Sequence, residues 1–188
     1  MTSLIVLLGA VAVLAMWVIG VYNRLIGLRN QKENGWRQID VQLKRRHDLI
    51  PNLVNTVRGA MEFERDTLTA VMEARAKAMA ATGPAEAGRT EGALTQALGR
   101  LFALAENYPQ LRANENVKML QEELASTENK VGFARQFYND IATKYNIARE
   151  VFPANMVAGM FGFGAAELFQ VTDDAERQVP AVDLSMKK

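Results

Sequence analysis

The sequence predicts an all-α protein in which an N-terminal transmembrane helix is followed by an antiparallel bundle of long helices. Two observations predict this fold class. Residues 1–23 carry no charged side chain, so all 22 Lys/Arg and all 21 Asp/Glu residues lie from Arg24 onward. In most of the remaining chain, apolar residues recur at steps of three and four positions, which is the spacing of a helix face. Period-two alternation long enough for a sheet is absent from the sequence.

The first element is the apolar run at residues 4–22. As a helix, these residues would rise about 28 Å, which is close to the hydrocarbon thickness of a bilayer. Trp17 and Tyr22 stand near its end, where amphipathic rings suit the headgroup layer. The alternative is a cleaved signal peptide, which normally has basic residues before a shorter apolar core. Because residues 1–3 carry no charged side chain, an uncleaved anchor is the favoured interpretation.

The charges after the apolar run predict its orientation. Nothing basic precedes the run, whereas four basic residues follow it closely: Arg24, Arg29, Lys32 and Arg37. Cationic flanks stay on the cytoplasmic side of a membrane. We therefore expect a single-pass protein of the bacterial cytoplasmic (inner) membrane, with residues 1–3 outside and the body in the cytoplasm.

The body, residues 23–171, is expected to contain two long helices and one shorter helix. The first long helix follows the apolar periodicity from Asn30 to Ala81. Pro51 predicts a kink or a restart near 48–51, because proline removes a backbone donor and clashes with the carbonyl of His47. The small, turn-prone residues 80–88 are expected to form a hinge that ends this helix.

The shorter helix is expected from about Arg89 to Asn107, where the following Tyr108-Pro109 ends it. The second long helix shows the clearest periodicity, with five heptads of apolar positions at residues 117–152. This spacing predicts a coiled-coil-like seam packed against neighbouring helices.

The segment 151–166 is uncharged and rich in Met, Phe and Gly. Three interpretations remain open: it covers the bundle as core, it contacts a second subunit or partner, or it touches the membrane interface. The residues predicted to make such a contact are Met160, Phe161 and Phe163. Residues 172–188 are polar and expected to form a flexible tail.

Composition excludes several kinds of chemistry. The chain has no cysteine, which excludes a disulfide scaffold, a zinc–thiolate site and a thiol nucleophile. Its single histidine, His47, lies in a charged run and is expected to be solvated or locally paired. Motifs of metalloproteases, serine hydrolases and phosphate-binding loops are missing. With a net charge of +1 and mixed signs throughout, no nucleic-acid surface is expected. We expect no enzymatic activity, no catalytic residue, no cofactor and no metal.

Polar residues embedded in the apolar pattern form the candidate site. Two Tyr-Asn pairs, at 138–139 and 145–146, repeat at seven positions and share one helix face. We expect a buried polar network that fixes helix register at some cost in stability. Its predicted members are Asp40, Arg46, Asp48, Glu128, Arg135, Asn139 and Asn146. The alternative is a polar cleft that binds a ligand.

Long, ordered motifs in the chain resemble the LemA family of bacterial membrane proteins. The matching stretches are Tyr22-Asn23, Trp36 with IDVQLKRRHDLIPNLVNTV (39–57), ENYPQL (106–111), LQEELASTENKVGFARQFYNDIATKYN (120–146) and FPANMVAGMFGF (152–163). The resemblance runs from the anchor to about Val171. It implies a single N-terminal membrane helix, a small exterior tail and a cytoplasmic helical domain, and it carries over no catalytic residue.

The resemblance also bears on function. It implies membrane organisation, because a magnetosome-vesicle protein is similar to this family, and a link to membrane zinc proteases of the stress response. We expect a non-enzymatic scaffold or assembly protein at the cytoplasmic membrane surface, whose partners are the lipid bilayer, further copies of itself and other membrane proteins such as stress-response proteases. The alternative is a ligand-binding or stress-related sensor or adaptor that uses a polar cleft in the bundle.

Overall fold

The computed structural model describes residues 1–61 and 63–171, and these are helical apart from short connections and one extended C-terminal segment. The helices are α1 (Thr2–Arg58), α2 (Arg65–Ala80), α3 (Gly83–Ala105), α4 (Pro109–Arg112), α5 (Glu115–Glu150) and α6 (Ala154–Met160). The described part of the chain contains no strand. The predicted all-α fold class is confirmed, with a long N-terminal helix packed against a second long helix.

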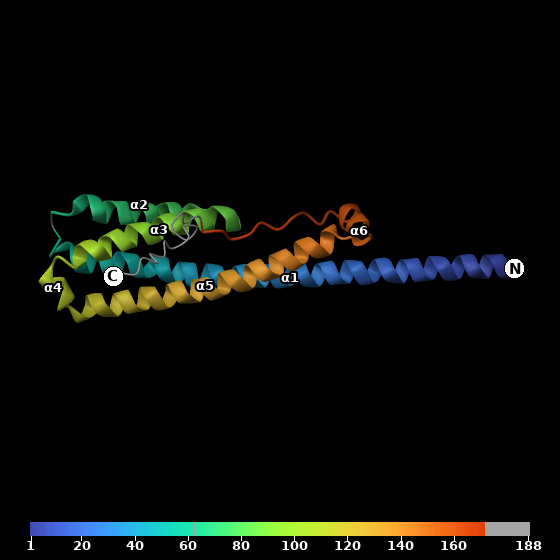
Figure 1. The fold of residues 1–188 in the computed structure, drawn as a ribbon, viewed down its shortest axis with the longest axis horizontal. Helices are drawn as coiled ribbons and strands as arrows, with labels where there is room; N and C mark the ends of the chain where they lie inside the picture. Colours follow the sequence, from blue (N-terminus) through green and yellow to red (C-terminus); the bar gives the residue numbers. More distant parts are fainter. Residues whose placement is uncertain (62, 172–188) are drawn as a thin grey trace, which may run out of the picture.

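Helices α1 and α5 pack side by side through the body, and the elements that cover this pair differ between its two halves (Figure 1). In the half far from the N-terminus, α2 and α3 form an antiparallel hairpin that completes a four-helix bundle with α1 and α5. In the half near the N-terminus, an extended segment runs back along α5 instead of a helix. We call this segment, residues 163–171, the strap.

Each half has its own core. In the far half, Leu53 and Val57 of α1 are buried together with Leu94 and Leu101 of α3. In the near half, Ile39 of α1 and Tyr138 of α5 are buried together with Phe169 of the strap. The far core is therefore built by helices and the turn that joins α1 to α2, whereas the near core depends on the strap.

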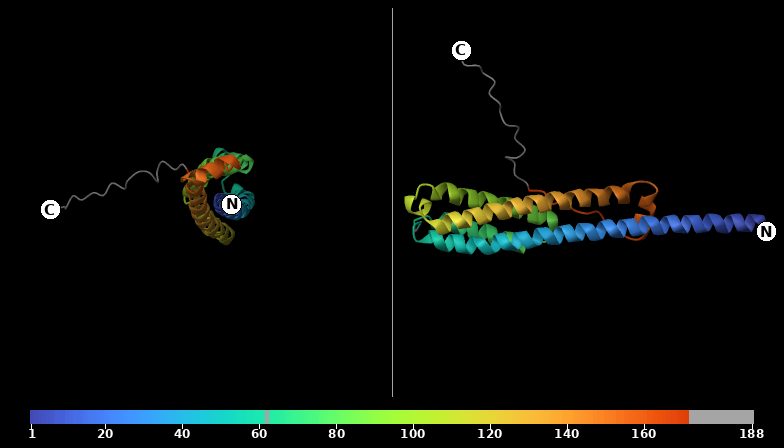
Figure 2. Two further views of the ribbon diagram at one scale, coloured as in Figure 1. Left: turned by 90° about the vertical axis from the view of Figure 1, so that its right-hand side faces the viewer. Right: turned by 90° about the horizontal axis from the view of Figure 1, so that it is seen from below.

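The N-terminal third of α1 leaves the body and projects alone (Figure 2). This part of the described chain supplies the one helix that is long and apolar enough to cross a membrane. Every residue from Met1 to Trp17 is exposed, including large apolar side chains such as Leu7 and Ile5. A lone apolar helix is unfavourable in water and suited to lipid, where its backbone hydrogen bonds are satisfied internally.

The helix breaks differ from those expected. The helix neither restarts nor ends at Pro51, because α1 continues through it to Arg58. The carbonyl that Pro51 cannot bond, that of His47, instead accepts a hydrogen bond from Arg75 Nε of α2 at 2.7 Å. The expected single helix over 30–81 is also wrong, since the chain reverses between Arg58 and Arg65.

This second error arises because Val57 before the reversal, Met61 within it and Leu68 after it are all buried in the far core. The apolar pattern therefore runs on across the turn and does not reveal it. The expected hinge at 80–88 is shorter, because α3 already begins at Gly83. Segment 151–166 contains α6 and the start of the strap, and the expected tail at 172–188 lies outside the described residues.

Candidate functional site

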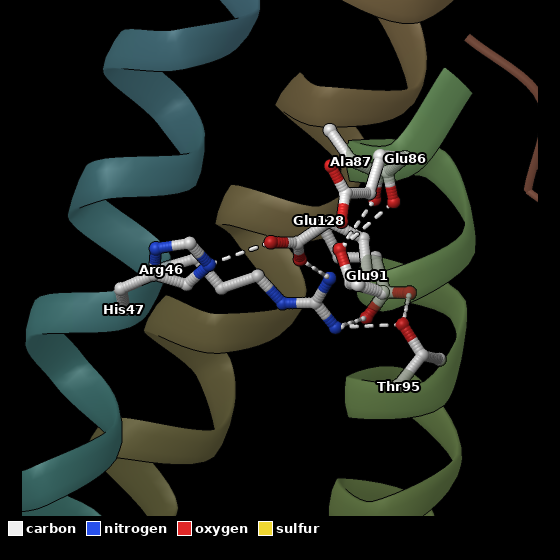
Figure 3. Close-up of polar contacts among 8 residues, drawn as sticks. Arg46, His47, Glu86, Ala87, Glu91, Thr95 and Glu128 are labelled. Atoms are coloured by element: carbon white, nitrogen blue, oxygen red, sulfur yellow. Dashed lines mark hydrogen bonds and ion pairs between the residues drawn. The ribbon is translucent and has the colours of Figure 1, made fainter. Parts of the chain in front are cut away.

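The centre of the body contains a buried cluster of charged and polar side chains built around Arg46 of α1 (Figure 3). Arg46 is only 3% exposed. Its Nη1 donates to Glu91 Oε2 of α3 at 3.0 Å. Its Nη2 donates to Thr95 Oγ1 at 2.8 Å and to Glu128 Oε2 of α5 at 3.3 Å. One guanidinium therefore joins three helices.

The neighbouring His47 lies in the same cluster. Its ring is buried, and Nε2 stands 2.5 Å from Glu91 Oε1. The expectation that this imidazole is solvated or locally paired is therefore wrong, because its partner lies on another helix. Its backbone carbonyl also accepts from Arg75 of α2. Positions 46 and 47 thus connect α1 to each of the other three long helices.

Glu91 holds the cluster together electrostatically. It is 2% exposed, and its two carboxylate oxygens face Arg46 and His47 separately. A buried carboxylate is tolerated when it is paired and hydrogen-bonded in this way. Glu128 adds a second, half-exposed carboxylate to the same guanidinium and accepts from Thr95 Oγ1 at 3.3 Å.

A small cavity of about 190 Å³ adjoins the cluster. Arg46, Glu91, Glu128, Arg135 and Phe169 are among its lining residues. Arg46 Nε is buried and has no hydrogen-bond partner within the described part of the chain. The cavity is polar enough and large enough to hold water or a small polar molecule.

The two Tyr-Asn pairs of α5 form a second polar feature, which binds the backbone of the strap. Asn146 Nδ2 donates to the Ala166 carbonyl at 2.9 Å, and the Ala166 amide donates back to Asn146 Oδ1 at 2.8 Å. Asn139 makes the same pair of bonds with Phe169, at 3.0 and 2.9 Å. Each amide side chain therefore satisfies both backbone groups of one strap residue, as a neighbouring strand would.

The tyrosines of the two pairs extend the same pattern. Tyr145 donates to the Gly164 carbonyl at 3.0 Å, and Tyr138 donates to the Glu167 carbonyl at 2.7 Å. Arg149 Nε adds a bond to the Phe163 carbonyl at 3.1 Å. One face of α5, which we call the α5 ladder, in this way bonds five carbonyls and two amides of the extended strap.

The spacing explains why a heptad repeat binds an extended chain. The Tyr-Asn pairs are seven positions apart, which is about 10.5 Å along a helix. The pair at 145–146 binds strap residues 164 and 166, and the pair at 138–139 binds residues 167 and 169. The partners on the strap are therefore shifted by three positions. Three extended residues span about 10 Å, so helix and strap stay in register when they run antiparallel.

The phenols of the α5 ladder are held in their neutral, donating form. Burial is the larger cause and the nearby Glu167 carboxylate the smaller, and together they raise the pKa of Tyr138 to about 12. Burial also raises the pKa of Tyr145, against the smaller opposing effects of Arg149 and Arg29. Both hydroxyls therefore remain hydrogen-bond donors at neutral pH.

The structure brings together some of the predicted site residues and separates others. Arg46 and Glu128 share the cluster, and Arg135 lines the adjoining cavity. Asp40 and Asp48 are exposed on α1 and take no part in the cluster's hydrogen bonds or ion pairs. Asn139 and Asn146 bind the strap rather than a charged partner.

The predicted contact residues also divide. Met160 and Phe161 are exposed, as a contact surface requires. Phe163 corrects the expectation, because it is buried against Tyr22, with ring centroids 5.6 Å apart. The Arg29 guanidinium also lies over the Phe163 ring, with its Cζ 5.8 Å from the ring centroid.

Sequence reasoning missed Glu91, Thr95 and the strap. A signal for Glu91 was present, because it precedes Leu94 and Leu98 at helical spacing and therefore occupies the buried stripe of α3.

Among the described residues, no group of three His, Cys, Asp or Glu side chains is arranged to hold a metal ion. The cluster's hydrogen-bonded, paired charges are suited to fixing helix positions.

Comparison with known proteins adds family information. Residues 35–184 match the model of the LemA family. Protein LemA of Metamycoplasma hominis is 26% identical over 159 residues, which covers 82% of this chain and 71% of that protein. Magnetosome protein MamQ of Magnetospirillum gryphiswaldense is 23% identical over 174 residues, covering 79% of this chain.

A further relative is magnetosome protein MamQ 2 of Paramagnetospirillum magneticum, which is 36% identical over 80 residues. That match covers 43% of this chain and 29% of the relative. The match to the Magnetospirillum gryphiswaldense protein covers 64% of its length. The chain thus spans less than two thirds of the magnetosome relatives that it matches.

Proposed function

This chain belongs to the LemA family, and from that membership and the geometry of α1 we propose that it is a membrane-anchored, non-enzymatic scaffold. It works at the cytoplasmic surface of the bacterial inner membrane, by self-association or by holding partners. The observation that carries the proposal is the continuity of α1, which runs unbroken from the exposed apolar segment to Arg58 in the far core.

This continuity supports a scaffold role for a mechanical reason. A helix has no flexible joint, so the body is held at a defined distance and direction from the anchor. Tethered bodies also diffuse in two dimensions, which raises their effective concentration and allows weak contacts to assemble. The positive residues that follow the span support a cytoplasmic body.

An exposed apolar groove between α1 and α5 supports assembly. The groove encloses about 520 Å³, and its lining includes Val41 of α1 with Phe133 and Phe137 of α5. Phe133 is 74% exposed and Val41 is 63% exposed. Clustered apolar side chains on a surface mark interaction sites. We assign this groove to contacts between copies, with other membrane proteins, such as stress-response proteases, as the alternative partners.

Cross-linking in vesicles tests the assembly. Because the chain has no cysteine, Phe133→Cys in the full chain gives a unique reactive site in the groove. Oxidation at low protein density is expected to trap dimers through this residue. Met119→Cys is the matched control, because Met119 is also an exposed apolar residue of α5. Equal cross-linking of both variants, or a monomeric mass after mild solubilisation, would contradict self-association through the groove.

Extraction of membranes tests the anchor separately. The full chain is expected to remain with the membrane after washing with alkaline carbonate, which removes peripheral proteins. Protease added to the outside of intact cells should leave the body intact. Release by carbonate would overturn the anchor, and external digestion of the body would overturn the orientation.

A second candidate function is a ligand sensor, which the cavity of about 190 Å³ beside Arg46 and Arg135 supports. The mass of the folded chain, measured under native conditions after mild solubilisation, would then include a bound small molecule. Arg135→Ala should release that molecule without unfolding the bundle. A mass equal to that of the polypeptide alone would count against this function.

A further inference from the structure

The end of the body nearest the N-terminus carries a group of exposed apolar side chains that neither the charge cluster nor the α5 ladder uses. They lie on α6 and its flanks, and their exposed fractions are 80% for Phe152, 65% for Met156, 74% for Met160 and 50% for Phe161. We call this group the α6 patch. No charged residue occurs in the chain between Glu150 and Glu167.

Helix α6 lies beside the point where α1 leaves the body (Figures 1 and 2). Tyr22 of α1 packs edge-on against Phe161, with ring centroids 4.9 Å apart. Leu25 of α1 and Ala158 of α6 belong to the same buried core. Val157 and Ala158 thus fasten α6 to the body, while Met156 and Met160 on the same short helix remain outside.

The anchor fixes the depth of this patch. If residues 4–22 fill the hydrocarbon layer, Tyr22 stands at its boundary. A side chain in contact with Tyr22 then lies in the headgroup layer, which extends several ångströms beyond the hydrocarbon. Phe161 makes that contact, and α6, which precedes it directly, also packs against α1.

We infer that the α6 patch inserts into the lipid interface beside the anchor and forms a second membrane contact. The inference rests on the proposed anchor and goes beyond it by assigning a lipid-facing role to α6. Its chemistry suits the interface, where flexible Met and aromatic Phe side chains enter the boundary between headgroups and acyl chains. The basic residues Arg24 and Arg29 follow the span and supply attraction to anionic headgroups.

A second contact changes what the anchor can do. A single helix permits the body to rotate freely about the membrane normal and to tilt in any direction. A lipid contact on one side of α1 favours tilt toward α6. The groove at Val41 and Phe133 is then presented at a defined angle to neighbouring copies.

Depth-dependent quenching tests the inference with the full chain in vesicles of phosphatidylcholine and phosphatidylglycerol. Met156→Cys and Met160→Cys each give a unique site for a small fluorophore, because the chain has no cysteine. Lipids that carry a spin label near the headgroup or deep in the acyl chain serve as quenchers. We expect the shallow label to quench both sites at least twofold more than the deep label.

Two further positions complete the experiment. Leu14→Cys, in the apolar segment, should be quenched more by the deep label. Phe133→Cys is the matched exposed apolar control on the body, and it should be quenched by neither. This residue shares the groove with Arg37, which is about 22 Å further along α1 than Tyr22.

The outcomes separate the two proposals. Quenching at Leu14 without quenching at either α6 position would overturn the lipid contact and leave the anchor intact. Protection of the α6 positions from both lipid and aqueous quenchers would show that protein covers the patch. This result would also overturn the proposed lipid contact. Absence of quenching at Leu14 would overturn the anchor itself.

Discussion

At the scale of single residues, Arg46 and Glu91 determine how the bundle's helices meet. Arg46 contacts α3 and α5, while Glu91 binds both Arg46 and His47. Interactions this deeply buried are strongly coupled, because removal of one partner leaves an uncompensated charge away from water. The cluster therefore specifies the arrangement of α1, α3 and α5, with Arg75 adding α2.

The first prediction concerns Glu91. Glu91→Ala leaves the buried guanidinium with one half-exposed carboxylate, so the free energy of unfolding should fall by about 3–5 kcal/mol. The matched control is Glu123→Ala, which removes an exposed ion pair to Arg45 at 2.7 Å and should cost no more than about 1 kcal/mol. Denaturant unfolding measures both values. Similar losses in the two variants would show that burial of the cluster contributes little.

The second prediction concerns Gly88 of α3. A Cβ at this position would overlap the backbone carbonyl of Gln170, at the end of the strap. Gly88→Ala should therefore displace the strap or α3 and destabilise the fold by about 1–3 kcal/mol.

Gly99→Ala is the control for that substitution, because it lies on the same helix with nothing within 4 Å of its added Cβ. Alanine is the better helix former, so this variant should gain about 0.5–1 kcal/mol. Thermal unfolding of both variants gives the comparison. A gain in stability for both would mean that α3 and the strap do not approach each other as described.

At the scale of elements, the strap and the α5 ladder form one unit. The strap has no sheet partner among the described residues, and its extended backbone is bonded by side chains of α5. The near core includes Phe163 and Phe169 from the strap, so its packing depends on these polar bonds. Loss of the α5 ladder should thus loosen the half of the body that adjoins the apolar N-terminal segment.

The third prediction tests this dependence. Asn139→Ala removes two hydrogen bonds to Phe169 and leaves its buried backbone groups unpaired, at a cost of about 1–3 kcal/mol. Amide exchange of the strap should accelerate, while exchange in the far bundle should change little. Asn129→Ala, an exposed asparagine of the same helix, should stay within about 0.5 kcal/mol. Unchanged strap exchange in Asn139→Ala would contradict the role of the ladder.

The fourth prediction concerns alkaline pH. The pKa of Tyr138 is about 12 in the fold and about 10 for an ordinary phenol, so the fold favours the neutral form. Below pH 10 the phenol is neutral in both states and its stabilising effect is complete. Between pH 10 and about 12, the Tyr138 phenol ionises in the unfolded chain before it does so in the folded one. Its contribution to the free energy of unfolding is therefore lost over this range.

Trp36 reports on this region, since its ring lies 5.8 Å from Tyr138 and 6.2 Å from Phe169. In a Trp17→Phe background, its fluorescence during denaturant unfolding gives the stability at each pH. The loss between pH 10 and 12 should be smaller in Tyr138→Phe. An identical loss would mean that this phenol is not the group responsible.

Local pattern predicted the helices well and their ends less well. The periodicity of residues 117–152 corresponds to α5, Glu115–Glu150, because a seam that packs along its whole length has an unbroken repeat. The turn after Arg58 gave no break in the apolar pattern, because both sides of it face one core. The strap could not be predicted, because its hydrogen bonds come from side chains distant in sequence.

The candidate site shows the same division. Arg46 and Glu128 were predicted from polar residues within helical patterns, and the Tyr-Asn repeat was recognised as a feature of one helix face. The partner of this repeat, the backbone of the strap, was not predicted, since a side-chain amide pairs equally well with charged groups and with peptide groups. The path of the chain after α6 decides which kind of group faces these asparagines.

At the scale of the whole molecule, the described residues form a long helical rod (Figure 1), and its N-terminal end is apolar and exposed. The same helix supplies the exposed N-terminal segment, the edge of the near core and the edge of the far core. The apolar segment is therefore joined to the body without a linker.

The fifth prediction, and the most direct test of the account, is a distance measured along α1 with the full chain in lipid nanodiscs. Spin labels at Leu14→Cys and Val41→Cys are both on exposed positions of this helix. At 1.5 Å per residue, they should lie about 40 Å apart in a single narrow distribution. A broad distribution, or a mean shorter by ten ångströms or more, would show a joint between anchor and body and contradict the account.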